Sequence, residues 1–197
     1  MTETASDGLL VGPDGVSRCA WAGSAPEYLA YHDDEWGRPV HGESALYERF
    51  TLEAFQSGLS WITILRKRPA FRTAFAEFDA ERVAAFDDAD RARLMADAGI
   101  VRNARKVDAA IANARAVLDL RADGGLDAFV WSFAPEHHEP PRTVADFRAT
   151  SPESVALATG LKKRGFVFVG PTTAYAAMQA CGLVDDHLAG CFRAATT

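Results

Sequence analysis

Two cysteines and two histidines near the ends of the chain carry the side chains that a zinc ion prefers. His187 and Cys191 are separated by three residues, so a helix would place both on one face. Cys19 and His32 lie near the other end of the chain. Together the four residues suit tetrahedral zinc, although their spacing is not that of a zinc finger. The alternative is that Cys191 is a small buried residue and His187 a hydrogen-bonded polar one. If all four bind, no position is left for water, and the metal would join the ends of the chain without catalysing.

A carboxylate lies within an apolar helical stripe. Glu53 follows Phe50 by three residues and Leu46 by seven, in a helix that the apolar pattern predicts over residues 43–57. A carboxylate buried in this way is costly unless it meets a donor or a cation. Two interpretations remain open from the pattern: an ion pair with an arginine, or a group that binds a ligand.

Aromatic residues are concentrated in the first third of the chain. They supply more aromatic surface than a core requires, and they would suit stacking on a planar base. Core packing is the alternative for each of them. The residues are Trp21, Tyr28, Tyr31, Trp36 and Trp61.

The charges exclude a protein that is basic overall but not one with local basic surface. The net charge is −6 and the pI is about 5.4. Basic residues gather in three short clusters, which are either solvated faces or contacts for an anionic partner. The clusters are residues 66–68, Arg102 with Arg105 and Lys106, and Lys162 with Lys163 and Arg164.

The elements that must position these residues are helical. The apolar spacing predicts about ten short helices, including one over residues 61–68 that ends before Pro69 and a long one over residues 103–121. Asp79 and Asp88 are predicted N-caps. The run over residues 166–169 resembles a strand but has no partner. The expected fold class is therefore all-α.

Size and composition predict one unit without a membrane segment. The chain has 197 residues, of which 48% are hydrophobic and 24% charged, as in a soluble globular protein. No apolar run is long enough to cross a bilayer, and the acidic start does not resemble a signal peptide. Three cysteines cannot all pair, which favours thiols or a metal in a reducing compartment. We therefore expect a cytoplasmic protein with a flexible tail over residues 1–16.

Five strings of residues, in this order, closely resemble the 3-methyladenine DNA glycosylase I family. The similarity covers about residues 17–192. The strings are Arg18-Cys19-Ala20-Trp21, Tyr31-His32-Asp33-Asp34-Glu35-Trp36-Gly37, Ser57-Gly58-Leu59-Ser60-Trp61, Lys162-Lys163-Arg164-Gly165-Phe166 and His187-Leu188-Ala189-Gly190-Cys191.

The resemblance implies a helix-hairpin-helix fold of two lobes with a cleft between them. A terminal lobe would comprise about residues 17–44 and 151–197, and a central lobe about residues 45–150. One structural zinc ion would be held by Cys19, His32, His187 and Cys191. The hairpin would be residues 98–102, where Gly99 and Ile100 direct backbone N–H groups at phosphates. Phosphate contacts would also come from two of the basic clusters: Arg102, Arg105 and Lys106, and Lys162, Lys163 and Arg164.

The resemblance also implies an activity, the release of 3-methyladenine from double-stranded alkylated DNA. Glu53 would bind the base through its amine, and the aromatic residues would stack on it. Leu59, an apolar residue on the turn at Gly58, either fills the gap that a flipped base leaves in the DNA or is a core residue. The family lacks the catalytic aspartate of its superfamily, so none of Asp119, Asp123 and Asp127 is assigned that role.

We expect a monomer that leaves an abasic site and does not cut the strand, since no lysine is placed as a Schiff-base nucleophile. A DNA-damage binding protein without catalysis is the alternative. A metalloenzyme is disfavoured because four protein ligands would leave no open position on the metal.

Overall fold

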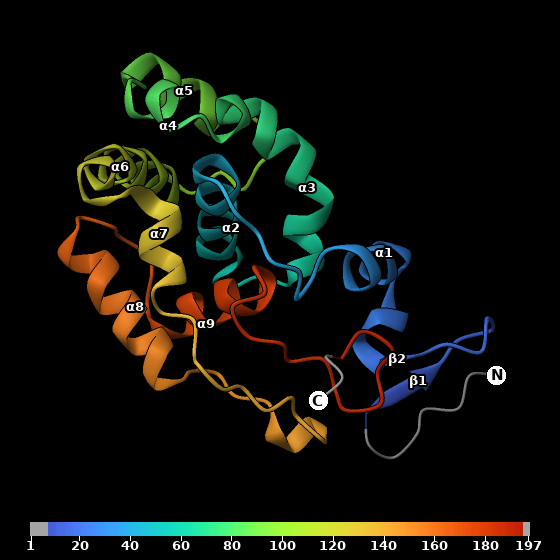
Figure 1. Ribbon diagram of the computed structural model, residues 1–197. Coiled ribbons are helices and arrows are strands. Elements are labelled where there is room, and N and C mark those ends of the chain that lie inside the picture. The colour runs from blue at the N-terminus through green and yellow to red at the C-terminus, as the bar shows by residue number, and fades with distance from the viewer. Residues whose placement is uncertain (1–7, 195–197) are drawn as a thin grey trace.

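The computed structural model describes residues 8–194. Helices make up most of this part of the chain, as expected, with a small N-terminal sheet (Figure 1). The helices are α1 (Pro26–Asp34), α2 (Glu43–Gln56), α3 (Trp61–Ala74), α4 (Ala80–Ala84), α5 (Asp88–Ala96), α6 (Ala104–Leu120), α7 (Gly125–Trp131), α8 (Pro152–Lys163) and α9 (Pro171–Ala180). Short 3-10 turns lie at Ala20–Ser24, Ala76–Phe78, Arg121–Asp123 and Val144–Asp146.

Helix α2 is central because it is apolar on several sides. Leu46, Phe50 and Phe55 are all buried in the main hydrophobic core. The helix packs against α3, α6, α7 and α9. This packing confirms the buried helix predicted from the sequence, and it leaves the C-terminal turn of α2 to carry Glu53.

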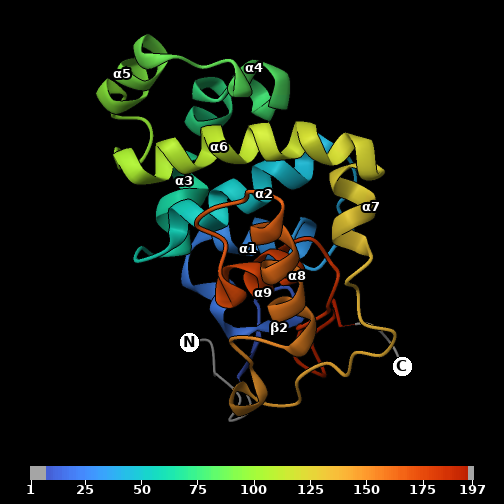
Figure 2. The same cartoon turned by 90° about the vertical axis from the view of Figure 1, so that its left-hand side faces the viewer.

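Helix α6 separates two groups of helices. In the view of Figure 2 it crosses the molecule between α4 and α5 on one side and α8 and α9 on the other. Asn103 caps its N-terminus by accepting a hydrogen bond from the Lys106 amide. Val107, Ile111 and Ala114 lie on its buried face, as the apolar spacing predicts, whereas Val117 is buried in place of the expected Leu118, which is only partly buried.

Some predicted helix limits were wrong. Asp79 is an N-cap, as predicted, but Asp87 rather than Asp88 caps α5, because the Asp87 carboxylate accepts the amides of Ala89 and Asp90. Helix α3 continues through Pro69 to Ala74. Residues 166–169 form no strand; the structure shows an irregular loop there.

The N-terminal part of the described chain contains the structure's two-stranded sheet. Strand β1 (Leu9–Val11) pairs antiparallel with β2 (Ser17–Cys19), with Leu9 opposite Cys19. The expected flexible tail over residues 1–16 is therefore wrong from residue 8 on, and so is the expected absence of paired strands. The register explains why, since it places Leu9 against Cys19 in a small buried cluster. Residues 1–7 lie outside the described part.

The C-terminal segment lies beside this hairpin. Cys191 and Leu188 share the small cluster with Leu9 and Cys19. The expected last helix turn with His187 and Cys191 on one face was wrong: the chain forms turns here, and the Phe192 amide donates to the Ser17 carbonyl of β2. The two ends of the described chain thus meet, as Figure 1 shows.

Helices α8 and α9 bury their apolar side chains in the main core. Leu157, Leu161, Tyr175 and Met178 belong to the same cluster as Phe50. The second, separate cluster is confined to the strands and the segment around Leu188.

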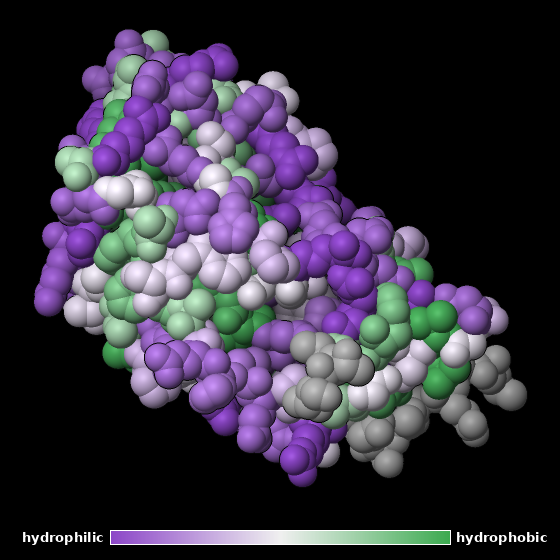
Figure 3. Space-filling model, viewed as in Figure 1, coloured by the Kyte–Doolittle hydropathy of each residue, from purple (hydrophilic) through white to green (hydrophobic). Residues whose placement is uncertain are grey.

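The surface is mainly polar on the face shown in Figure 3. Hydrophilic residues predominate over α3, α4 and α5, whereas apolar surface is visible near the centre, where α7, α8 and α9 lie in Figure 1. No helix among residues 8–194 combines the length and apolar character needed to cross a membrane.

Candidate functional site

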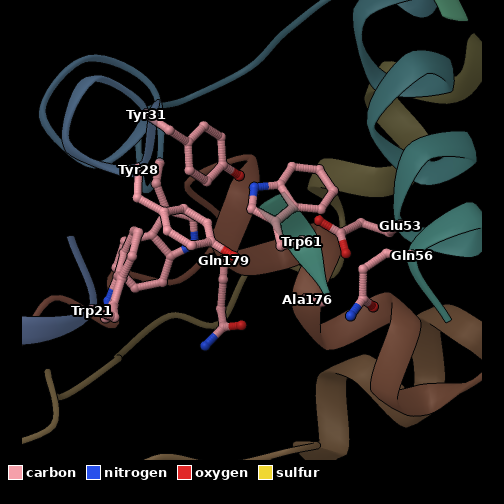
Figure 4. A pocket seen from close by; sticks show the side chains of 9 residues that line it. Trp21, Tyr28, Tyr31, Glu53, Gln56, Trp61, Ala176 and Gln179 are labelled. Carbon is pink, nitrogen blue, oxygen red and sulfur yellow. The ribbon is translucent and has the colours of Figure 1, made fainter. Parts of the chain in front are cut away.

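A cavity of about 360 Å³ gathers the carboxylate and all five aromatic residues singled out in the sequence. This volume is within the range of small-molecule sites. Figure 4 shows side chains from several elements pointing toward one space. Its lining comprises Trp21, Tyr28, Tyr31, Trp36, Glu53, Gln56, Trp61, Ala176 and Gln179.

The aromatic walls are held by contacts among themselves. Tyr31 on α1 lies 5.5 Å from Trp61 at the start of α3, measured between ring centroids, with their planes at 46°. The Trp21 ring meets Tyr28 and Trp36 edge-on, at 5.8 and 5.2 Å. These rings are therefore fixed in place before any ligand arrives.

Tyr28 also has a structural role. Its hydroxyl accepts a hydrogen bond of 2.9 Å from the Ile62 amide, in the first turn of α3. This contact satisfies a helix N–H group that has no partner within α3. It also ties α1 to α3, so Tyr28 fixes the separation of the two helices that carry Tyr31 and Trp61.

Glu53 reaches the cavity from α2 and points toward the Trp61 ring (Figure 4). It is only 7% exposed. Burial raises the pKa of its carboxyl to about 8, with Arg49 acting in the opposite direction. Burial in the free protein therefore favours the neutral form of this carboxyl.

The ion pair considered as an alternative role for Glu53 is absent among the described residues. The guanidinium of Arg49 instead donates to Glu35, with Nη2 2.9 Å from Oε2. Its Nη1 is buried without a hydrogen-bond partner. Glu53 is thus free to meet a ligand.

The turn after α2 holds an apolar side chain outward beside the cavity. Gly58 has a φ of +80°, which favours glycine, and Leu59 is 38% exposed. The side chain of Gln56, itself part of the cavity wall, donates to the Leu59 carbonyl at 2.7 Å. The turn therefore keeps a fixed position relative to the cavity.

In the hairpin between α5 and α6, several backbone groups form hydrogen bonds with side chains of the protein itself. The Asp97 carboxylate accepts the Gly99 amide at 2.7 Å, so this N–H group is not directed outward as expected. Ile100 is buried and packs in the core. The ammonium of Lys67 donates to the Ala98 and Gly99 carbonyls.

Lys106 was expected to contact phosphate at the surface, but it is buried. Its ammonium donates to the carbonyls of Phe55 and Ser57, at 2.8 and 2.6 Å, and the residue is only 7% exposed. It binds carbonyl groups at the C-terminal end of α2 rather than phosphate. Arg102 and Arg105, in contrast, are exposed.

The third basic cluster is divided in the same way. Lys162 and Lys163 are exposed at the end of α8. The guanidinium of Arg164, however, stacks on Phe129 at 4.1 Å and lies 3.9 Å from the Asp123 carboxylate. Its expected role as a free cation is not what the structure shows.

None of the three aspartates downstream of the hairpin lines the cavity. Asp119 and Asp123 are exposed. Asp127 bonds to the His41 ring and the Gly42 amide, and so connects α7 to the start of α2.

A second cluster of chemically active side chains lies at the ends of the chain. The donor atoms of Cys19, His32 and Cys191 lie within 4.8 Å of one another, and all three residues are buried. Sγ of Cys191 is 3.4 Å from Nε2 of His32. Hydrogen bonds from Cys19 and His32 lower the pKa of the Cys191 thiol. A buried thiolate beside a thiol and an imidazole is a set of groups that could hold a metal ion.

His187 lies next to this trio but outside it. Its ring centroid is 4.9 Å from that of His32. Its Nδ1 is 2.7 Å from the Asp185 carboxylate, while its Nε2 is buried without a hydrogen-bond partner. A Cβ at Gly37 would lie 2.7 Å from the ring, so a glycine is needed for this close approach.

Several cavity residues had not been anticipated. Gln56 follows Glu53 by three residues on the same helix and so shares its face, a signal that was available in the sequence. Ala176 and Gln179 come from α9, which the chain brings back against α2. No local pattern marks them, because only the tertiary fold places them there.

Comparison with known proteins gave one consistent result. The methyladenine glycosylase family model matches residues 21–194. DNA-3-methyladenine glycosylase 1 of Escherichia coli strain K12 is 48% identical over 181 residues, covering 89% of this chain and 96% of the relative. DNA-3-methyladenine glycosylase of Haemophilus influenzae is 43% identical, with coverages of 89% and 97%.

Solved structures are similar along the same length. A crystal structure of 3-methyladenine DNA glycosylase I has a TM-score of 0.86 and 45% identity, covering 90% of this chain and all of that one. The enzyme from Staphylococcus aureus, studied for its recognition of 3-methyladenine, has a TM-score of 0.86 and 34% identity, with coverages of 91% and 97%. A further variant structure contains bound 3-methyladenine.

Proposed function

The chain belongs to the methyladenine glycosylase family, and from this premise we infer that it is a DNA-3-methyladenine glycosylase of base-excision repair. It hydrolyses the N-glycosidic bond of 3-methyladenine in alkylated DNA and leaves an abasic site. The observation that carries this function is the buried Glu53 carboxyl in a cavity walled by aromatic rings. Release of free base from methylated DNA, resolved by chromatography, tests it. Binding to damaged DNA without release would indicate a damage-binding protein instead.

The cavity suits a cationic purine that has been turned out of the DNA helix. Loss of stacking on flipping costs a few kcal/mol, and less for a damaged base. Stacking on Tyr31 and Trp61 would offset this cost, at about 1–3 kcal/mol per base. A positively charged ring gains further from the faces of Trp and Tyr side chains.

Glu53 supplies selectivity for adenine. Its carboxylate would accept a hydrogen bond from the exocyclic amine and attract the cationic ring. The carboxylate would repel the O6 acceptor of a guanine, so binding of a methylated guanine in the cavity would be unfavourable. Since burial keeps the carboxyl neutral in the free protein, we propose that the cationic base itself promotes ionisation of Glu53 on binding.

We propose that no protein nucleophile is needed. A methylated, positively charged purine is already a good leaving group, so the site has mainly to position it and stabilise the separating charges. The described lining of the cavity contains no lysine that could form a Schiff base with the sugar. A monofunctional enzyme without strand cleavage is the consequence.

We propose a structural zinc ion held by Cys19, His32, His187 and Cys191. Two observations support the fit. Each histidine directs Nδ1 at a carboxylate, Asp33 for His32 and Asp185 for His187, which is the usual support for a metal-binding imidazole. The buried Nε2 of His187 lacks a partner that a metal would supply. The ion would connect the two ends of the chain and take no part in the reaction.

The DNA-binding surface that we propose includes the helix-hairpin-helix segment formed by α5, residues 97–103 and α6. Arg102 and Arg105 would contact phosphates there, and Lys162 and Lys163 would do so at the end of α8. Leu59 would fill the gap left by the flipped nucleotide. The DNA would bind at a cleft between the terminal lobe, about residues 17–44 and 151–197, and the central lobe, about residues 45–150.

We further propose that the enzyme acts as a monomer in the cytoplasm. A single chain supplies Glu53, the aromatic walls and the candidate metal ligands, so the proposed chemistry requires no second copy. The three cysteines are free thiols, which suits a reducing compartment.

A further inference from the structure

A groove of about 740 Å³ lies along the N-terminal half of α9, outside the base cavity. One wall comes from α8 and the loop after it, and the other includes the turn that follows α2. The lining residues are Ser57, Ala158, Thr159, Lys162, Gly165, Phe166, Val167, Phe168, Val169, Gly170, Pro171 and Thr173.

The groove lies beside the cavity. Gln56 lines the cavity and the next residue, Ser57, lines the groove. On α9, Ala176 lines the cavity and Thr173 the groove, and three residues of helix rise about 4.5 Å. The groove and the cavity are thus neighbours along both α2 and α9, and DNA whose damaged base enters the cavity would lie near the groove.

The loop over residues 165–170 holds an aromatic ring at the groove in an unfavourable backbone conformation. Phe168 is 37% exposed and has a φ of +62°, which is uncommon for a bulky residue. The side chain of Asn113, 2% exposed on α6, bonds to both the amide and the carbonyl of the neighbouring Val167, at 2.8 and 3.1 Å. Strain that is maintained by a buried polar side chain is characteristic of functional loops.

The surroundings of Phe168 suit a nucleic acid base. The guanidinium of Arg105 lies 5.7 Å from the centroid of its ring. Lys162 lines the groove, and no carboxylate does, although the chain has a net charge of −6. An exposed ring between cations offers stacking to a base and attraction to its phosphate.

We propose that Phe168 stacks on the base of the undamaged strand that is left unpaired when the 3-methyladenine nucleotide enters the cavity. The inference rests on the proposed function, since that function supplies the flipped nucleotide. Gln56 lines the cavity and bonds to Leu59, so a damaged strand that enters beside these residues would leave the groove at Ser57 to the opposite strand. The contact would stabilise the extruded state without touching the damaged base.

The test uses a duplex in which a tetrahydrofuran abasic analogue lies opposite 2-aminopurine, a base whose fluorescence falls when it is stacked. We expect the wild-type chain to quench this fluorescence. Phe168→Ala should abolish most of the quenching and weaken binding to this duplex roughly tenfold, whereas Phe168→Tyr should retain both properties. Val155→Ala is the matched control, because Val155 is an exposed apolar residue on α8 outside the groove.

A second measurement separates the two strands. Phe168→Ala should lower release of 3-methyladenine from duplex DNA but leave release from single-stranded DNA within about twofold. Equal quenching by Phe168→Ala and wild type would overturn the proposal. Equal loss of release from both substrates would also overturn it, because the ring would then contact the damaged strand. Absence of base release by the wild type would refute the proposed function, while the quenching would still report the contact.

Discussion

Arg49 lies one helical turn before Glu53 on α2, and it directs its hydrogen bond away from Glu53 to Glu35. The cation therefore lowers the pKa of Glu53 through space but not by direct pairing, and burial remains the larger influence. The carboxyl that we propose as the base-binding group therefore has a pKa close to neutral pH.

The pH dependence of base release follows from this position. Because ionised Glu53 is the productive form, kcat/KM should rise with pH around a midpoint near pH 8 and level off only above that midpoint. Removing the nearby cation with Arg49→Met should move the midpoint to higher pH. Arg68→Met is the control, since Arg68 also pairs with Glu35 but is not among the causes of the Glu53 shift. A flat profile in the wild type would contradict the role of Glu53.

The charge of Glu53 can be removed without changing its shape. Glu53→Gln should lower the single-turnover release of 3-methyladenine roughly tenfold or more, equivalent to at least about 1.4 kcal/mol. Binding to undamaged DNA should change little. Discrimination against methylated guanine should narrow, because the new amide can donate to O6. Unchanged rates and an unchanged ratio of the two bases would show that Glu53 is only structural.

Stability should respond to pH in the opposite sense to activity. Glu53 has its pKa raised to about 8 from 4.5, so the protein gains stability from the neutral carboxyl below pH 4.5 and loses it progressively as pH rises through 8. Glu53→Gln has no such loss. The free energy of unfolding of the variant relative to wild type should therefore rise between pH 5 and 9, by an amount on the order of several kcal/mol. Denaturant titrations at the two pH values measure it, and a constant difference would contradict the assignment.

The metal site predicts a specific pattern of stability. Purified protein should contain one zinc per chain, and Cys19→Ala should lose the metal and lower the melting temperature strongly. Cys181→Ala is the matched control, because Cys181 is also a buried free thiol but lies outside the trio. Protein without zinc, together with an unaltered melting temperature for Cys19→Ala, would refute the site.

Salt dependence distinguishes neighbouring basic residues on α6. Arg105→Ala should lower the slope of log affinity against log salt by about one unit, because an exposed phosphate contact is lost. Lys106→Ala should leave the slope unchanged and instead lower stability, since its ammonium bonds to the carbonyls after α2. An unchanged slope for Arg105→Ala would mean that Arg105 contacts no phosphate, and a lowered slope for Lys106→Ala would contradict the buried role of its ammonium.

Much of the site could be predicted because its signals are local. Glu53 stands out as a carboxyl on an apolar helix face, and the aromatic residues stand out by their density. The structure gathers all of them around one cavity. The family resemblance then gave these positions an expected chemistry, and the family was confirmed by comparison.

The errors arose where tertiary contacts override local patterns. Lys106 sits in a basic cluster, yet the end of α2 provides carbonyls that bind its ammonium. His187 and Cys191 have helical spacing, yet the segment pairs with β2 and forms turns. The groove at Phe168 was not anticipated, because the buried Asn113 that holds its loop is distant in sequence.

The joined ends of the chain have a practical consequence for anyone handling the protein. The Trp21 ring contacts His32 at 5.1 Å, and the Trp36 ring contacts His187 at 4.6 Å, so two walls of the cavity rest directly on the cluster at the ends of the chain. A truncation before Cys191, or a deletion that removes Cys19, would therefore disturb the substrate pocket itself. The parts of the sequence that are usually treated as expendable in cloning are here among those nearest to the chemistry.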